Sequence, residues 1–222
     1  MRSLRIHDVK WSTDIAGPGP NGLRTEIFLR GCRRARLGQP CEECFNPTLW
    51  KDDVEDKISI DMAVKRILKY APTRHVTIGG GEPTDQLYSL IDLVHGLKRY
   101  DFHIILYTWR SLVEMASYHF GETQHLLGGI DILVDGEYRS DQRIYDSTAK
   151  NGVCNWIGSA NQTVWDVKSW REHAETSALM GVTAGDIERL YLNDDNDLML
   201  VPLAKASPKK IVLSEFVEDN YG

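Results

Sequence analysis

The sequence lacks any run of apolar residues long enough to cross a membrane, and its first residues, Met1 to His7, lack the apolar segment of a secretory signal. We therefore expect a cytoplasmic protein. It also lacks an excess of basic residues: the formal net charge is -6, which argues against a nucleic-acid partner. No low-complexity tract interrupts the 222 residues, 42% of which are hydrophobic, enough to bury one substantial core.

Cysteine is also scarce, and its distribution is uneven. Three of the 4 cysteines, Cys32, Cys41 and Cys44, fall in one loop after a predicted strand, whereas Cys154 lies far downstream. In a reducing compartment proximity gives thiols no structural benefit, but a soft metal or an iron-sulfur cluster needs several thiolates close together. The short gap between Cys41 and Cys44 allows one tight turn to present both thiolates to one centre.

The cysteine loop has three thiols and not four. Structural zinc and an electron-transfer cubane each use four protein ligands, so a set of three leaves one position open for a substrate or cosubstrate. The alternatives are a zinc-binding knob or three unrelated thiols. Cys154 is either a buried, inert thiol or a fourth ligand that folds back. A fourth ligand would close the site and make the chain a non-catalytic metal-binding module.

Short β-branched and aromatic runs alternate with apolar stripes at helical spacing. Strands are predicted at 25–29, 75–78, 104–107, 130–134 and 163–167, and helices at 60–70, 87–97 and 111–118. Ser59 is a predicted N-cap. The alternation is typical of an α/β fold, with a mainly parallel sheet that is either open or curled into a barrel.

The alternation of strand and helix patterns ends near residue 170. We expect a core at residues 1–170 and a C-terminal appendage at 171–222 that contains a β-hairpin. The hairpin would join 189–192 to 197–201 through the turn at 193–196, and 211–213 would add a strand.

Unusual residues follow several of the predicted strands. Cys32, Gly79 to Glu82, Thr108 and Asp135 each come directly after one, so we expect them at one face of the sheet. The three glycines allow the backbone to approach a ligand closely, and Pro83 restricts Glu82. The turn can offer backbone groups and a carboxylate to the ammonium of an amino-acid-like ligand. A simple packing turn is the alternative.

In this order and spacing the motifs resemble those of the radical S-adenosylmethionine enzymes. Among these they resemble the activating enzymes of anaerobic ribonucleotide reductase, relatives of the pyruvate formate-lyase activases. The resemblance runs from about Ile15 to Val167 and rests on Gly17-Pro18-Gly19 with Arg24, Gly31-Cys32, Cys41, Cys44-Phe45-Asn46-Pro47, Trp50, Gly80-Gly81-Glu82-Pro83, Tyr107-Thr108, Asp131 to Gly136 and Gly158 to Gln162.

The resemblance implies a fold, a cofactor set and a ligand set. The fold would be a partial (β/α)6-type parallel barrel with a small C-terminal β appendage. Three irons of a [4Fe-4S] cluster would bind Cys32, Cys41 and Cys44, and the fourth iron would bind S-adenosyl-L-methionine. The methionine end would contact Gly80, Gly81 and Glu82, the adenine would lie near Phe45, and Thr108 would line the pocket. No catalytic side chain is expected beyond the cluster and this site.

The resemblance also implies a reaction and its partners. An electron from a donor such as flavodoxin or ferredoxin would reduce the cluster, and the 5′-deoxyadenosyl radical released from S-adenosylmethionine would abstract hydrogen from a glycine of the large reductase subunit. The sequence departs from the family in the 8 residues between Cys32 and Cys41, where three are usual, and in Gly79, where serine is more frequent. A small molecule or peptide substrate, as for a deazapurine-forming synthase, is therefore the alternative.

Overall fold

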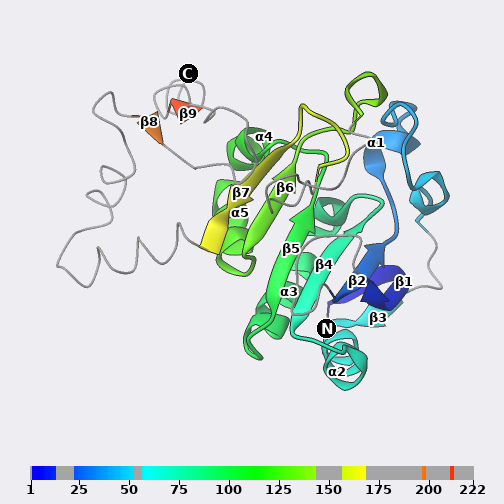
Figure 1. Ribbon diagram of the computed structural model, residues 1–222, viewed down its shortest axis with the longest axis vertical. Helices are drawn as coiled ribbons and strands as arrows, with labels where there is room; N and C mark the ends of the chain where they lie inside the picture. Colours follow the sequence, from blue (N-terminus) through cyan, green and yellow to red (C-terminus); the bar gives the residue numbers. More distant parts are fainter. Residues whose placement is uncertain are drawn as a thin grey trace.

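The computed structural model describes residues 2–13, 23–52, 57–143 and 157–168, with two short strands at 197–198 and 211–212. Within these residues, one mixed sheet of 7 strands has the order β3-β1-β2-β4-β5-β6-β7 (Figure 1). The strands are β1 (Ser3–Thr13), β2 (Arg24–Leu29), β3 (Lys57–Ser59), β4 (His75–Gly80), β5 (His103–Tyr107), β6 (Ile132–Asp135) and β7 (Thr163–Asp166). Strands β2, β4, β5 and β6 are parallel, whereas β1, β3 and β7 pair antiparallel.

Helices cover one side of this sheet (Figure 1). They are α2 (Ile60–Tyr70), α3 (Leu87–Lys98), α4 (Leu112–Tyr118) and α5 (Phe120–Gly128), while the short α1 (Arg33–Arg36) lies in the cysteine loop. Three 3-10 turns complete the described elements: η2 (Pro47–Leu49), η4 (Pro83–Gln86) and η5 (Ser140–Gln142). Of the helices described, none has the length and apolar character needed to span a membrane.

Polar caps fix where two helices begin. The Ser59 hydroxyl accepts a hydrogen bond from the Met62 amide at 3.3 Å, as expected for the predicted N-cap of α2. Ser111 caps α4 in the same way, through the Glu114 amide at 3.1 Å. Apolar residues recur every three or four positions in α2 and α3, so one face of each helix packs against the sheet.

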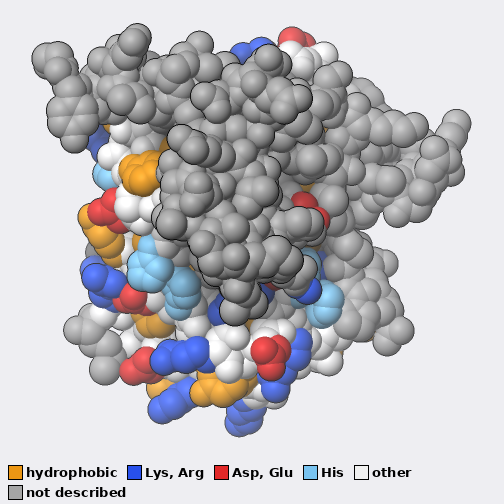
Figure 2. Space-filling view, turned by 90° about the vertical axis from the view of Figure 1, so that its left-hand side faces the viewer, with side chains coloured by type: hydrophobic (Ala, Val, Ile, Leu, Met, Phe, Trp, Pro, Cys, Tyr) orange, Lys and Arg blue, Asp and Glu red, His pale blue; other side chains and the backbone are white. Residues whose placement is uncertain are grey.

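Side chains on the central strands alternate between two environments. Ile27, Ile78 and Leu106 belong to the main core under the helices. Ile105 and Val134 belong to a smaller apolar cluster on the opposite face of the sheet. That opposite face is the one that is free of helices in Figure 1, and it leads to the cavity described below. On the side of the molecule shown in Figure 2, the visible side chains of the described residues include interspersed basic and acidic groups.

The α/β prediction is confirmed, and its parallel strands lie where the periodicity predicts them. The strand predicted at 163–167 is present as β7, and its antiparallel pairing with β6 makes the sheet mainly, but not wholly, parallel. A residue pattern identifies a strand but carries no information on its direction. The sequence analysis also misses β1, β3, α1 and α5. In β1 the side chains alternate only weakly between buried and exposed, so the period-two pattern that marks a strand is faint in its sequence.

Several predictions lie outside the described residues. These are the Gly17-Pro18-Gly19 turn, Cys154 and the strand at 189–192. Near the C-terminus, β8 (Asp197–Leu198) pairs antiparallel with β9 (Ile211–Val212). The division at residue 170 and the closure of the sheet into a partial barrel stay predictions.

Candidate active site

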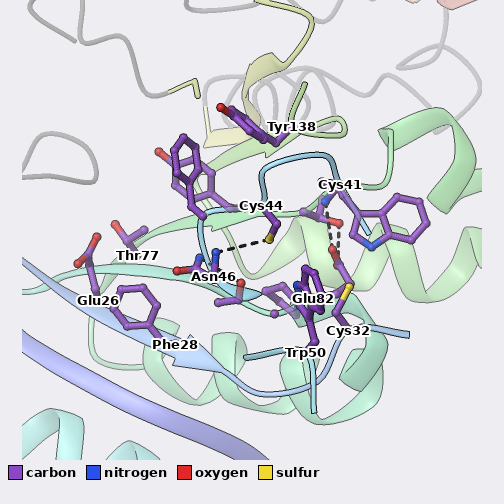
Figure 3. Close-up of a pocket in the computed structure, with 18 of the residues that line it drawn as sticks. Glu26, Phe28, Cys32, Cys41, Cys44, Asn46, Trp50, Thr77, Glu82 and Tyr138 are labelled. Carbon is purple, nitrogen blue, oxygen red and sulfur yellow. Dashed lines mark hydrogen bonds between the residues drawn. The ribbon is translucent and has the colours of Figure 1, made fainter. Parts of the chain in front are cut away.

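A cavity of about 240 Å³ opens at the carboxyl ends of the parallel strands. Its walls include all the site residues proposed from the sequence: Cys32, Cys41, Cys44, Phe45, Gly80, Gly81, Glu82 and Thr108. Figure 3 shows the cysteines reaching it from the loop after β2, while Glu82 comes from the turn after β4. Residues that are far apart in the sequence therefore share one cavity.

Backbone hydrogen bonds hold the cysteine loop in place. The Gly31 amide donates to the Leu49 carbonyl at 2.8 Å, and the Cys32 amide donates to the Trp50 carbonyl at 3.1 Å. The loop therefore folds back on itself, with its distal end beside Cys32. Gly31 has a φ of 93°, a conformation that L side chains rarely adopt, which explains the glycine before the first cysteine.

The three thiols are free and differ in exposure. Cys32 is buried, and Cys41 and Cys44 are half-buried. The Cys44 sulfur accepts a hydrogen bond from the Asn46 amide at 3.5 Å (Figure 3). Burial raises the pKa of Cys32 and that of Cys41, although Arg34 opposes the second shift. Because burial disfavours the thiolates, a cationic centre is needed to hold them in the form that ligates metal.

This donor set fits an iron-sulfur cluster. Among the described residues, no three His, Cys, Asp or Glu side chains are placed to hold a single metal ion. A cubane binds each cysteine at a separate corner, so its ligands stand farther apart than the ligands of one ion. Three thiols that line one cavity supply the number of cysteine ligands that a cubane with one open iron uses.

The glycine turn packs against the cysteine loop. The Gly81 amide donates to the Leu29 carbonyl at 2.9 Å. A Cβ atom at Gly80, where φ is 117°, would lie 2.4 Å from the Leu29 oxygen, and one at Gly81 would lie 2.3 Å from the Gly31 oxygen. Both glycines are therefore required by packing. Gly79 differs, because a Cβ there would meet nothing closer than the Tyr107 Cβ at 3.9 Å.

Strand β4 continues through Gly79 and Gly80, which pair with Phe28 and Leu29 of β2. The sequence analysis ended this strand at residue 78, two residues too early. Pairing with β2 holds both glycines in the strand, so the chain turns only at Gly81. The turn therefore begins level with the end of β2, next to Cys32.

Glu82 is 1% exposed, and its carboxylate is bound by the protein itself. Oε1 accepts hydrogen bonds from the Thr84 amide at 2.9 Å and the Thr108 hydroxyl at 2.8 Å, and Oε2 accepts one from the Trp109 amide at 3.1 Å. The Arg110 guanidinium lies 3.5 Å from Oε1. Burial raises the pKa of Glu82, and these partners oppose the shift. Glu82 therefore ties the turn after β4 to the loop after β5.

Aromatic rings form another wall. The Phe45 and Tyr138 rings are 4.4 Å apart, and the Arg143 guanidinium lies over Phe45 at 5.2 Å. Two guanidinium groups contact the Trp109 ring, that of Arg34 at 5.1 Å and that of Arg110 at 4.5 Å from its centroid. Sequence reasoning missed Tyr138 and Trp109. Their positions directly after the Asp131 to Gly136 and Tyr107-Thr108 motifs were the available signal.

The Gly158 to Gln162 motif supports the loop after β6. The Gln162 side-chain amide donates to the Gly136 carbonyl at 2.9 Å, and the Asn161 amide group donates to the Glu137 carbonyl at 2.7 Å. Asp135 does not line the cavity, because its carboxylate accepts a hydrogen bond from the Leu112 amide at 2.5 Å and so anchors the start of α4. Asp135 therefore ends β6 at the same edge of the sheet as the other residues, as expected, but it stabilises the fold there and does not line the cavity.

Comparison with known proteins agrees with this geometry. Residues 15–165 match the family model described as a 4Fe-4S single cluster domain. The chain is 32% identical over 162 residues to the anaerobic ribonucleoside-triphosphate reductase-activating protein of Vibrio cholerae, an alignment that covers 68% of this chain and 90% of the relative. It is 25% identical over 177 residues to the pyruvate formate-lyase-activating enzyme of Clostridium pasteurianum, covering 76% of this chain and 67% of the relative.

Proposed function

Because the chain belongs to the radical S-adenosylmethionine family of enzymes that activate glycyl-radical enzymes, we propose that it generates the glycyl radical of an anaerobic ribonucleotide reductase. The observation that carries this proposal is the meeting of three cysteines and the glycine turn in one cavity. The cofactors would be a [4Fe-4S] cluster and S-adenosyl-L-methionine.

Each predicted residue has a place in this proposal. Cys32, Cys41 and Cys44 would bind three irons of the cluster. The backbone of Gly80 and Gly81, held in position by Glu82, would meet the methionine end of S-adenosylmethionine. Phe45 would contact the adenine, Thr108 would line the pocket, and the sheet would curve as a partial (β/α)6 barrel around them.

When bound, the reduced cluster and S-adenosylmethionine together supply an electron and a hydrogen-abstracting radical. The chain itself supplies orientation and exclusion of water. Cys32 is buried against the turn at Glu82, and the buried carboxylate of Glu82 fixes that turn through Thr108 and Trp109. A turn fixed in this way holds its bound ligands in a defined orientation before the reaction begins.

A specific comparison favours the reductase as substrate. The reductase-activating protein of Vibrio cholerae is 32% identical and the alignment covers 90% of that relative, whereas the pyruvate formate-lyase-activating enzyme of Clostridium pasteurianum is 25% identical and the alignment covers 67% of it. The partners would be the large reductase subunit and an electron donor such as flavodoxin or ferredoxin.

The test uses anaerobically reconstituted protein with S-adenosylmethionine, a reductant and the large subunit of an anaerobic ribonucleotide reductase. We expect 5′-deoxyadenosine by chromatography and a glycyl radical on the reductase by electron paramagnetic resonance. Deoxyadenosine without a glycyl radical would remove the proposed substrate. Formation of deoxyadenosine driven by a small-molecule extract would then favour the alternative substrate class.

Cysteine variants test the cluster separately. Changing Cys32, Cys41 or Cys44 to alanine should abolish the iron-sulfur absorbance and the bound iron. Cys154→Ala is the matched control and should retain both. Loss of iron from Cys154→Ala would indicate a closed site with four cysteine ligands and would contradict the proposal.

A further inference from the structure

The cavity extends past the glycine turn to a second end. Glu26 and Phe28 of β2 and Thr77 and Gly79 of β4 line that part. In the parallel register Glu26 pairs with Thr77, three residues before the pair Leu29 and Gly80. At a rise of about 3.3 Å per residue, Glu26 lies about 10 Å along the strand from the glycine turn. Figure 3 shows Glu26, Thr77 and Phe28 on the side of the cavity opposite Cys32.

Glu26 is a buried carboxyl group without a partner. Its residue is 8% exposed, and within the described residues its side chain has no hydrogen bond or ion pair. Burial raises the pKa of Glu26, and Lys10 and Arg24 oppose that shift. Its oxygens are not among the fully buried atoms without a partner, so water reaches them from the cavity. A ligand that displaces this water has to supply a donor in its place, because a carboxylate left buried without one costs on the order of 1–3 kcal/mol.

The neighbouring cations do not supply this donor. Lys10 is the cross-strand neighbour of Glu26, but its Nζ lies over the Phe28 ring at 5.0 Å. Arg24 lies on the same face of β2 as Glu26, but its guanidinium is engaged elsewhere: its Nε donates to the Thr77 hydroxyl at 2.8 Å, and its Nη1 lies 3.0 Å from Nδ1 of His75. The free acceptor therefore faces the cavity.

The carboxyl group of Glu26 and the absence of a side chain at Gly79 together indicate that this end of the cavity binds a peptide backbone. Gly79 contributes no side chain, and a Cβ there would have only the Tyr107 Cβ at 3.9 Å as a neighbour. Phe28 supplies an apolar surface beside it. A polypeptide segment around a glycine presents little besides its backbone, whose N–H groups are donors of the kind that Glu26 lacks.

We propose that Glu26 is a substrate-recognition residue, which accepts a hydrogen bond from a backbone N–H of the partner segment that carries the target glycine. This inference rests on the proposed function and extends it, since it assigns the cysteine end of the cavity to S-adenosylmethionine and the Glu26 end to the polypeptide. Glu26 acts by positioning the segment and takes no part in the electron transfer.

The test compares Glu26→Leu and Glu26→Gln in the reconstituted enzyme, with the large reductase subunit as probe. We expect Glu26→Leu to raise the KM for the reductase at least tenfold. The ratio of deoxyadenosine to glycyl radical should also rise several-fold. The KM for S-adenosylmethionine and the iron content should stay within twofold of the wild type. Glu26→Gln should give a smaller increase, because its amide oxygen still accepts a hydrogen bond.

Glu122→Gln, on α5 across the sheet from the cavity, is the matched control and should behave as the wild type. If Glu26→Leu fails to bind the cluster, the KM of Glu26→Gln for the reductase provides the test. An unchanged KM for the reductase would overturn the inference, and so would a raised KM for S-adenosylmethionine alone, which would place Glu26 on that ligand.

The two proposals fail in different ways. If the wild-type enzyme leaves no radical on the reductase, the proposed function fails, and the inference about Glu26 falls with it because it names that substrate. If the wild type activates the reductase and the Glu26 variants activate it equally well, only the inference fails.

Discussion

The backbone amide of Glu82 donates a hydrogen bond to the carbonyl of Gly31, with 2.7 Å between nitrogen and oxygen. This bond joins the turn after β4 to the residue that precedes Cys32. The two segments therefore form one unit, in which the position of the first cysteine depends on the backbone of the glycine turn. Changes to either segment should affect the other.

Gly81→Ala should separate the two segments, whereas Gly79→Ala should not. The new Cβ at Gly81 would lie 2.3 Å from the Gly31 oxygen, but the one at Gly79 meets no atom within 3.4 Å. We expect Gly81→Ala to lower the free energy of unfolding by about 3 kcal/mol and to reduce bound iron. Gly79→Ala should stay within about 1 kcal/mol of the wild type. Thermal unfolding and iron analysis measure both effects, and equal stability of the two variants would contradict this account.

Glu82→Gln should destabilise the turn even though it preserves size. The carboxylate accepts hydrogen bonds from Thr84, Thr108 and Trp109, and the amide group of glutamine would direct N–H bonds at one of these donors. We expect a loss of about 2 kcal/mol in the free energy of unfolding. Chemical denaturation measures it. Glu114→Gln, in the first turn of α4, serves as the control and should cost less than about 0.5 kcal/mol.

Phe45→Ala should weaken binding of S-adenosylmethionine without loss of the cluster. The Phe45 ring is 56% exposed, yet it contacts Tyr138 at the edge of the cavity. Removing an aromatic contact worth about 1.4 kcal/mol should raise the Kd about tenfold. Equilibrium binding to the reconstituted protein checks this. Leu37→Ala, at a position 67% exposed in the same loop, should leave the Kd unchanged.

The stability of the fold should fall as the pH falls from about 6.5 to about 4. Burial lowers the pKa of His103 from its ordinary value of 6.5 to about 4. The unfolded chain therefore takes up a proton in this range that the folded chain does not, which favours unfolding. We expect His103 to lower the free energy of unfolding by about 2 kcal/mol across this range. This figure is smaller than the full pKa difference implies, because the ring is only partly buried and solvent screens its charge.

His103→Gln should flatten this pH dependence, measured by urea denaturation across the range. The exposed His119 provides the control, since His119→Gln should leave the slope unchanged. The ring of His103 stacks on that of His75 at 5.2 Å, and Arg24, Asp131 and Lys98 also face it. If the stability of His103→Gln changes with pH as steeply as that of the wild type, the pH dependence arises from those neighbours instead.

Local patterns were sufficient for the parallel part of the fold. The runs that became β2, β4, β5 and β6 alternate with the apolar stripes of α2, α3 and α4, and Ser59 marks the start of α2. Chain direction and sheet margins were not predictable in this way. The direction of β7 and the pairing of β1 with both β2 and β3 depend on contacts between distant segments.

The residues of the cavity, like the strands, were predicted only in part from local patterns. The spacing of the cysteines and the order of the motifs identified residues that the structure brings together, from Cys32 to Thr108. The functions of individual groups were less visible. The glycines at 80 and 81 serve close packing, and the Glu82 carboxylate is occupied by the chain's own donors.

The sequence by itself determined the chemistry of this protein, because three thiols in one short loop and a glycine turn after a strand are local features that one segment can encode. Only the tertiary structure decided where these groups lie relative to Tyr138, Trp109 and the unpartnered Glu26. The physical reason is that burial, pKa and hydrogen-bond satisfaction depend on neighbours contributed by other strands and loops, and those neighbours are set by the packing of the whole sheet.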